Sequence, residues 1–118
     1  MFDIIFYRDA RGESDIVDYL DKLQEGSETN KSDRINRQKI LTYIAALGEY
    51  GFRLGEPYIK HIEGDLWELR PLRNRIFFFG WKDNKIVLLH YFIKKTRKTP
   101  DKEKRKALNN MKDFLERN

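Results

Sequence analysis

The sequence contains no cysteine and only two histidines, His61 and His90. Without thiols the chain forms no disulfide and no thiolate metal site, and two imidazoles leave too few ligands for a structural zinc site. No run of about 18 apolar residues occurs, so no segment is predicted to cross a membrane. The segment Met1–Phe6 carries no basic stretch ahead of an apolar one, which argues against a signal peptide. We therefore expect a soluble protein that stays in the cytoplasm.

The charge of the chain is unevenly distributed. Its 118 residues are the usual size of one domain, so residues 1–118 are predicted to form a single domain. Residues 1–59 carry 8 Lys and Arg against 11 Asp and Glu, whereas residues 60–118 carry 16 against 8. This asymmetry indicates that the second half contacts a polyanion. The alternative is that the lysines only keep a small protein in solution.

The hydrophobic patterns predict an α+β fold with two N-terminal helices, a curved antiparallel sheet of four to five strands, and a C-terminal helix. We expect the helices to pack on one side of the sheet. Ser32 is the expected cap of the second helix, which Gly48 or Gly51 would close and whose apolar stripe includes Ile35. The predicted elements are a strand over residues 2–8, helices over 13–24 and 32–48, strands over 58–62, 66–72, 75–81 and 86–93, and a helix over 101–117.

Side chains alternate between the two faces of a strand, so the sequence also predicts which residues share a face. In the strand over residues 66–72, Glu68 and Arg70 are expected on one face. In the last strand, Leu88, His90 and Phe92 are expected on one face together with Lys94.

Two groups of basic residues are expected to meet if their strands are neighbours. The first group surrounds a predicted hairpin and consists of Arg70, Arg73 and Arg75. The second follows the last strand and consists of Lys94, Lys95, Arg97 and Lys98, with Tyr91, Phe92 and Trp81 in reach. Such a patch suits RNA, because cations bind phosphates and aromatic rings stack on unpaired bases. In the alternative, Arg70 pairs with Glu68 or Glu63, the lysines are a solvated strand end, and the aromatic residues belong to the core. The predicted RNA contacts are Lys60, Arg70, Tyr91, Thr96, Arg97 and Lys98.

Glu68, His90 and His61 are the candidates for acid–base chemistry. RNA cleavage at its own 2′-hydroxyl needs a base, cations on the phosphate, and an acid for the leaving 5′-oxygen. The alternatives are that His90 is a hydrogen-bonded structural residue and that Glu68 neutralises an arginine. The sequence contains no Gly-rich phosphate loop, no Ser-centred nucleophile elbow and no His/Glu metal motif.

The segments Gly55–His61, Leu66–Ile76 and Leu88–Pro100 resemble the HigB branch of the RelE/ParE superfamily, the phage-derived-protein-like toxins of bacterial type II toxin–antitoxin systems. Leu-Trp-Glu-Leu-Arg-Pro-Leu-Arg and Phe-Ile-Lys-Lys-Thr are the most specific runs. The resemblance implies a RelE-like fold and a ribosome-dependent endoribonuclease that cuts mRNA without cofactor or metal. It also implies a separate helix-turn-helix antitoxin, similar to HigA, that binds the toxin in a hetero-oligomer.

The resemblance also implies roles for single residues. Arg75 resembles the arginine that contacts the scissile phosphate in RelE-like nucleases, and Lys95 falls near the basic residue that ends the last core strand. The position of the RelE catalytic lysine holds Glu68, and related toxins use a glutamate and a histidine as base and acid. The implied catalytic set is Glu68, Arg73, Arg75, His90, Lys94 and Lys95. Two other functions stay open: inhibition of DNA gyrase, as in the ParE branch, and binding of nucleic acid without catalysis.

Overall fold

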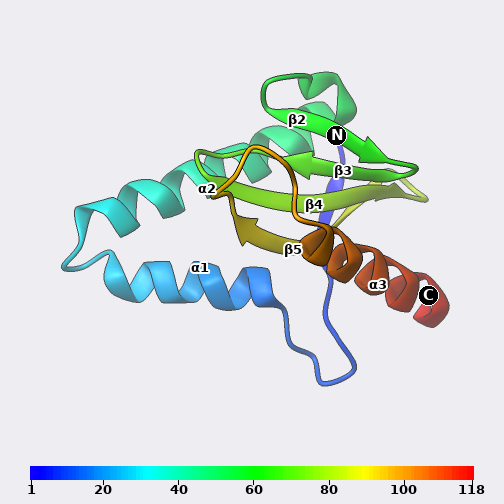
Figure 1. The fold of residues 1–118 in the computed structure, drawn as a ribbon, viewed down its shortest axis with the longest axis horizontal. Helices are drawn as coiled ribbons and strands as arrows, with labels where there is room; N and C mark the ends of the chain where they lie inside the picture. Colours follow the sequence, from blue (N-terminus) through cyan, green and yellow to red (C-terminus); the bar gives the residue numbers. More distant parts are fainter.

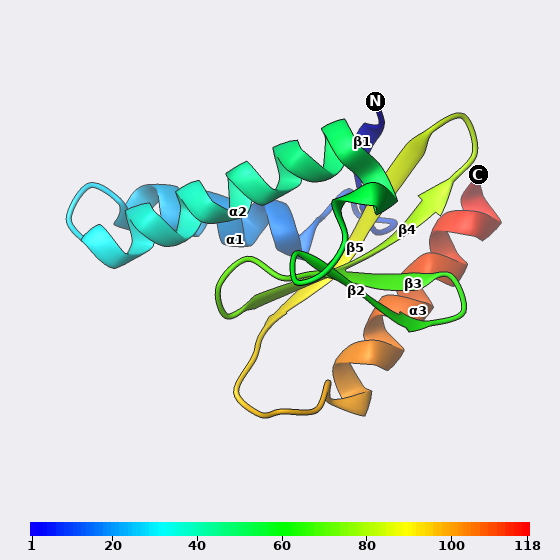
Figure 2. The same cartoon turned by 90° about the horizontal axis from the view of Figure 1, so that it is seen from above.

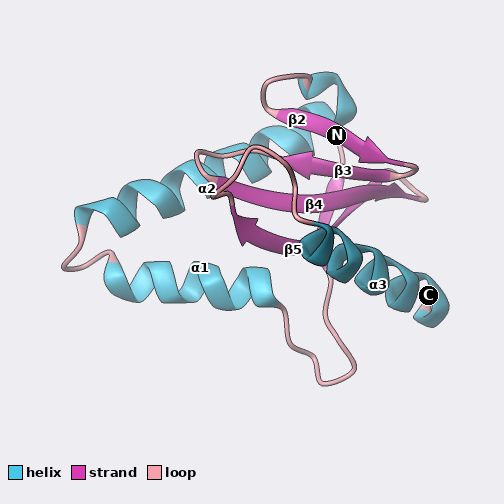
Figure 3. Cartoon of the chain, viewed as in Figure 1, coloured by secondary structure: helices cyan, strands magenta, loops and turns pink.

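The computed structural model describes residues 1–118 and confirms the α+β class, with helices and strands in the predicted order (Figure 1). Figure 3 shows the same chain with helices and strands distinguished. None of the helices combines the length and apolar character that crossing a membrane requires. The strands are β1 (Asp3–Phe6), β2 (Ile59–Glu63), β3 (Leu66–Leu69), β4 (Asn74–Trp81) and β5 (Lys85–Ile93), and the helices are α1 (Asp15–Gly26), α2 (Lys31–Tyr50), the 3-10 turn η1 (Gly51–Leu54) and α3 (Asp101–Arg117).

Polar caps set where the first two helices begin. The Oγ atom of Ser14 accepts the backbone N–H of Val17 at 3.2 Å and starts α1. The expected cap of α2, Ser32, is wrong by two residues, because Asn30 is the cap and its Oδ1 accepts the backbone N–H of Ser32 at 2.8 Å. Both residue types are good N-caps, and the side chain of Asn30 also accepts from a second N–H group of the first turn. α2 ends at Tyr50 and its C-cap is Gly51, one of the two glycines expected to close it.

The sheet has the strand order β1-β5-β4-β3-β2. The last four strands form the expected antiparallel meander. The expectation of a purely antiparallel sheet is wrong, however, because β1 pairs in parallel with β5 and Ile4 lies opposite Ile86. A tight hairpin cannot join two parallel strands. The chain between β1 and β5 instead runs through α1, α2 and the three other strands.

Helices cover both faces of the sheet, so the expectation that they all pack on one side is also wrong. α1 and α2 pack on one face and α3 on the other, as Figure 2 shows. The reason is that the central strands are apolar on both faces: Ile76 and Phe78 lie in a core of 12 buried residues under α1 and α2, and Phe77 and Phe79 lie in a core of 9 under α3. We call these the α1/α2 core and the α3 core.

One extra residue in β5 changes which side chains share a face. β4 pairs Phe77 with His90 and its next residue with Leu88, so Leu89 has no partner and forms a β-bulge. Leu89 and Phe92 consequently both lie in the α3 core, whereas Leu88 lies in the α1/α2 core. The expected grouping of Leu88 with His90 and Phe92 is therefore wrong, because the bulge shifts the alternation by one residue.

Candidate nucleic-acid interface

The two basic groups converge at one end of the sheet, as the sequence predicts. The antiparallel register places Asn74 opposite Ile93, and the backbone N–H of Lys94 donates to the carbonyl of Arg73 at 2.8 Å. The β3–β4 hairpin and the segment that leaves β5 are thus held side by side. We call the resulting set of side chains the cationic cluster: Lys60, Arg70, Arg73, Arg75, Lys94, Lys95, Arg97 and Lys98.

A buried carboxylate lies within the cationic cluster. The Glu68 side chain is only 2% exposed, and its Oε1 lies 3.5 Å from Nε of Arg70 and 3.8 Å from Nε of Arg75. Neither Nε atom has a hydrogen-bond partner, so the contacts are electrostatic rather than hydrogen bonds. Thr99 donates a long hydrogen bond of 3.4 Å to Oε2 of Glu68. The alternative expectation, that Arg70 pairs with Glu68, is therefore borne out, and Arg75 joins the pair.

The cluster shifts the pKa values of a carboxyl and an amine in opposite directions. Burial raises the pKa of Glu68, although the charges of Arg70, Arg75 and Lys94 and the hydrogen bond from Thr99 oppose the rise. Burial, followed by the charges of Arg75 and Arg70, lowers the pKa of Lys94. A carboxylate that binds a proton more readily and an ammonium that loses one more readily suit a base and an acid.

Arg75 is fixed by the hairpin that it supports. Its Nη1 donates to the carbonyl of Leu72 at 2.8 Å and to the carbonyl of Asn74 at 2.9 Å. Leu72 has a φ of 57°, a left-handed conformation that is uncommon for a residue with a side chain. Burial and the charge of Arg70 lower the pKa of Arg75, yet a guanidinium stays charged in proteins. The site therefore contains a rigid cation.

Two hollows open on either side of Lys94. The first has a volume of about 290 Å³, and Glu68, Lys60 and Thr99 are among its lining residues. The second has a volume of about 470 Å³, and its lining consists of Arg73, Arg75, Lys94, Lys95, Thr96 and Arg97. Lys94 and Arg97 line both, so the hollows adjoin. Because the second hollow has no acidic lining residue, it presents positive charge along its length.

The structure separates His90 from Glu68. Phe77 pairs with Glu68 on one side and with His90 on the other, which places the two residues two strand spacings, or about 10 Å, apart. Nδ1 of His90 contacts Asp15, and Nε2 lies 2.8 Å from Oε1 of Glu103. Burial lowers the pKa of His90, but these hydrogen bonds outweigh it and raise the pKa overall. These contacts agree with the alternative expectation, that His90 is a hydrogen-bonded structural residue.

The three aromatic residues expected near the patch are placed differently, because Tyr91 and Phe92 line a hollow together with Lys95 and Thr96 whereas Trp81 is remote. Tyr91 stacks on Tyr19 with ring centroids 4.2 Å apart, on the α1/α2 side of the sheet. Phe92 is buried in the α3 core, where it lies opposite Arg75 in the β4–β5 register, and Trp81 lies at the far end of β4, about 20 Å from the cluster at the rise of a strand. His61 lines the hollow of Glu68, but its Nε2 contacts the carbonyl of Gly64 at 2.8 Å. The length of β4 explains the distance of Trp81.

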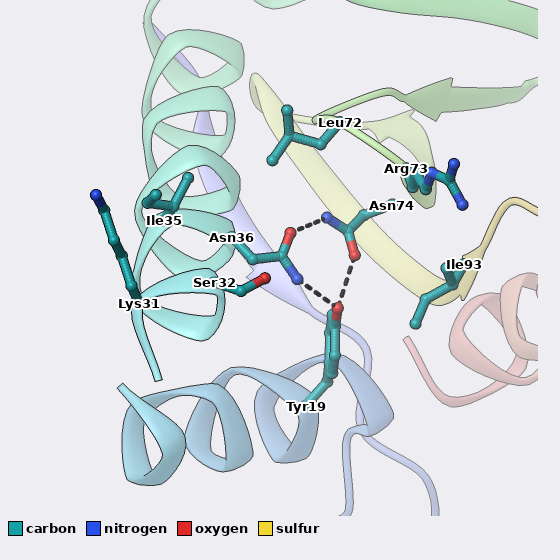
Figure 4. Close-up of a pocket in the computed structure, with 9 residues that line it drawn as sticks. All are labelled: Tyr19, Lys31, Ser32, Ile35, Asn36, Leu72, Arg73, Asn74 and Ile93. Carbon is teal, nitrogen blue, oxygen red and sulfur yellow. Dashed lines mark hydrogen bonds between the residues drawn. The ribbon is translucent and has the colours of Figure 1, made fainter. Parts of the chain in front are cut away.

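Sequence reasoning missed several polar side chains near the cluster. Thr99 contacts Glu68 from the loop before α3. Tyr19, Asn36 and Asn74 form a closed triangle of hydrogen bonds between α1, α2 and the start of β4 (Figure 4). Their positions in three separate elements leave no spacing signal in the sequence. A buried asparagine at the end of a hairpin is the only hint of a polar network.

Comparison with protein families gives one match, to the family described as Phage derived protein Gp49-like (DUF891), over residues 18–112. No curated protein matches the chain. The matched range includes most of α1, all of the antiparallel meander, the entire cationic cluster and most of α3. Since the match extends over most of the sequence and contains every residue of the cluster, the chain belongs to the Gp49-like family of phage-derived proteins, a family of RelE/HigB-like toxins.

Proposed function

We propose that this chain is the toxin of a type II toxin–antitoxin system of the HigB type, and that it acts in the cytoplasm as a ribosome-dependent mRNA interferase. Membership of a toxin family supports the first part of the proposal. The observation that carries the second part is a buried carboxylate, Glu68, held between Arg70 and Arg75 in a hollow walled by cations. At this place a proton acceptor lies among cations that can bind a polyanionic substrate.

In the proposed reaction Glu68 is the general base. It takes the proton of a ribose 2′-hydroxyl, whose oxygen then attacks the adjacent phosphorus. The bond from phosphorus to the 5′-oxygen of the next nucleotide breaks, which leaves a 2′,3′-cyclic phosphate and a free 5′-hydroxyl. The raised pKa of Glu68 favours this role, because proton transfer is most efficient when the pKa of the base approaches the working pH.

Cationic side chains meet the other two requirements of the reaction, which are charge stabilisation at the phosphate and an acid for the leaving 5′-oxygen. Arg75, with Arg70 and Arg73 beside it, stabilises the charge that develops on the phosphate oxygens in the transition state. Lys94, whose pKa is lowered, is the proposed acid that protonates the leaving 5′-oxygen, with Lys95 next to it. These roles need no metal ion. His90 acts in this proposal as a positioning residue, since it fixes β5 between α1 and α3.

The remaining cationic residues hold RNA and attract the partner. Lys60, Arg97 and Lys98 line the hollow of Glu68, and Thr96 with Lys95 lines the adjoining one, so a strand of mRNA can pass along both. The family implies an antitoxin. We propose a helix-turn-helix protein similar to HigA, whose acidic residues complement the cluster in a toxin–antitoxin hetero-oligomer.

The test compares cells that express the full chain, Glu68→Gln, Arg75→Ala, or Arg53→Ala. Arg53 is an exposed arginine of η1 and serves as the matched control. We expect the full chain and Arg53→Ala to stop growth and to produce cut mRNA. Loss of a general base slows cleavage by about 10²–10⁴, and loss of one charge-stabilising donor slows it by about 10²–10³.

Other outcomes point to the other functions. DNA damage with intact mRNA would identify an inhibitor of gyrase. RNA binding that weakens with salt, without any cut mRNA, would identify a binding module. Equal toxicity of Arg75→Ala and Arg53→Ala would remove the cationic cluster from the function altogether.

A further inference from the structure

A third hollow, of about 520 Å³, lies next to the cationic cluster between α2, the β3–β4 hairpin and the end of β5 (Figure 4). Three aliphatic side chains line it and are exposed: Ile35 at 49%, Leu72 at 51% and Ile93 at 45%. The expectation that Ile35 belongs to the core is therefore wrong. Exposed apolar residues that gather in one concave place mark a binding site. We call it the Ile35 hollow.

The wall of the Ile35 hollow contains the rigid polar triangle. The Tyr19 hydroxyl donates to Oδ1 of Asn74 at 2.7 Å, Nδ2 of Asn36 donates to the Tyr19 oxygen at 2.9 Å, and Nδ2 of Asn74 donates to Oδ1 of Asn36 at 2.7 Å. An amide has two N–H donors and an oxygen with two lone pairs. Asn36 thus keeps one donor and one acceptor beyond the triangle, and an amide in this state can pair with the edge of a base.

Charge connects the Ile35 hollow to the proposed RNA path. Its two ionisable lining residues besides Tyr19 are Lys31 and Arg73, and both are cations. Arg73 also lines the hollow that contains Arg75 and Lys94. A strand whose phosphate lies at Arg73 therefore passes the rim of the Ile35 hollow. The aliphatic side chains of the hollow favour an apolar, uncharged group, and its two cations favour a polyanion that carries this group. An unpaired nucleobase of RNA meets both conditions.

The hairpin links the wall of the hollow to the site of cleavage. Arg75, which is proposed to contact the phosphate, holds the carbonyl of Leu72 at 2.8 Å. Leu72 is thereby kept in its left-handed conformation with its side chain half exposed in the hollow. Residues in sparsely populated backbone regions persist where the surrounding structure holds them, and such places cluster at ligand sites.

We propose that the Ile35 hollow is a subsite for one unpaired base of the RNA, adjacent to the nucleotide whose phosphate the cationic cluster holds. The inference rests on the proposed function, because it assumes that RNA crosses Arg73. Ile35, Leu72 and Ile93 contact the faces of the base, and the amide of Asn36 reads its edge. The protein then prefers certain bases at one position beside the cut.

The test uses the full chain, the double variant Ile35→Ala/Ile93→Ala, Arg75→Ala, and Leu115→Ala as the control. Leu115 is exposed to a similar degree, 47%, but lies near the end of α3. Each is expressed in cells, and the ends of cut mRNA are sequenced to give both a rate and the base distribution beside the cut. Melting curves verify that the double variant is folded, which its exposed positions favour.

We expect the full chain and Leu115→Ala to show a bias at one nucleotide beside the cut. The double variant should cut about tenfold more slowly, as the loss of contacts to a single base implies, and should lose that bias. Cutting by the double variant at the rate and with the bias of Leu115→Ala overturns the subsite but not the nuclease, provided that Arg75→Ala is inactive. Absence of cutting by the full chain overturns the proposed function itself.

A further outcome identifies a different occupant. If the double variant cuts as the full chain does but is no longer neutralised by the antitoxin, the Ile35 hollow is a protein-binding surface. That result also overturns the base subsite.

Discussion

His90 gives the most direct prediction, because its ring is buried between two carboxylates from helices on opposite faces of the sheet. Each hydrogen bond between charged groups contributes about 1.5–3 kcal/mol. Since the side chains of Asp15 and Glu103 are 33% and 29% exposed, solvent screening reduces both contributions. We expect His90→Gln to lower the free energy of unfolding by about 2 kcal/mol, or the Tm by about 8 °C for a chain of this size.

The size of this loss should depend on pH. The pKa of His90 in the folded chain is raised above its ordinary value of 6.5. The extra stability is therefore fully present below about pH 6.5 and disappears as the pH rises through the folded pKa, because the unfolded ring loses its proton first. Thermal melts of the full chain and of His90→Gln, recorded from about pH 5.5 to 8.5 at fixed salt, should converge as the pH rises.

The other histidine provides the control for these melts. His61 is exposed, its Nε2 contacts the carbonyl of Gly64, and its ring lies edge-on to Trp67 without a carboxylate partner, so His61→Gln controls for the loss of a histidine as such. A gap between the full chain and His90→Gln that stays constant or widens with pH would refute a clamped imidazolium. At temperatures where it is folded, His90→Gln should also cut RNA within about tenfold of the full chain, whereas loss of a general acid costs about 10²–10⁴.

Three further predictions concern the site and the fold. Lys94→Met should slow RNA cleavage by about 10²–10⁴ if Lys94 is the acid, and sequencing of cut mRNA measures this directly. Asn74→Ala should cost about 2–3 kcal/mol in denaturant unfolding, because it leaves buried groups of the polar triangle unpaired; a loss below 0.5 kcal/mol would contradict that. Gly51→Ala should destabilise more than Gly12→Ala, since both have positive φ but only the first places a Cβ against the ring of Phe2; equal Tm values would contradict the clash.

Local patterns predicted the elements well, because amphipathic periods and caps depend on neighbouring residues. The predicted C-terminal helix, residues 101–117, agrees with α3, and the strand over 86–93 agrees with β5 to within one residue. The parallel partner of β1 was beyond reach, because β5 lies about 80 residues further along the chain and nothing local marks the pairing. The face that α3 covers depends on the same long-range packing.

In the candidate site, too, local patterns predicted some contacts, whereas contacts between distant elements were beyond reach. Arg73 and Lys94 could be brought together from the sequence, because a hairpin register places the ends of adjacent strands side by side. The partners of His90 could not, since Asp15 and Glu103 come from helices on either side of the sheet. Tyr91 is next to the basic strand exit in the sequence, but its ring stacks on Tyr19 of α1, a partner that no local pattern indicates.

The bulge at Leu89 makes the orientation of the side chains at the end of β5 depend on how many residues separate them from the bulge. The residues of β5 that follow it, and Lys94 at the strand exit, take their face from the number of residues between the bulge and themselves. Removing one residue from this stretch would turn Lys94 toward the opposite side of the sheet and away from Glu68, without altering a single functional side chain. Exchange of Leu89 for another apolar residue would keep the phase. The end of β5 therefore tolerates the substitution of a residue, but not the insertion or deletion of one.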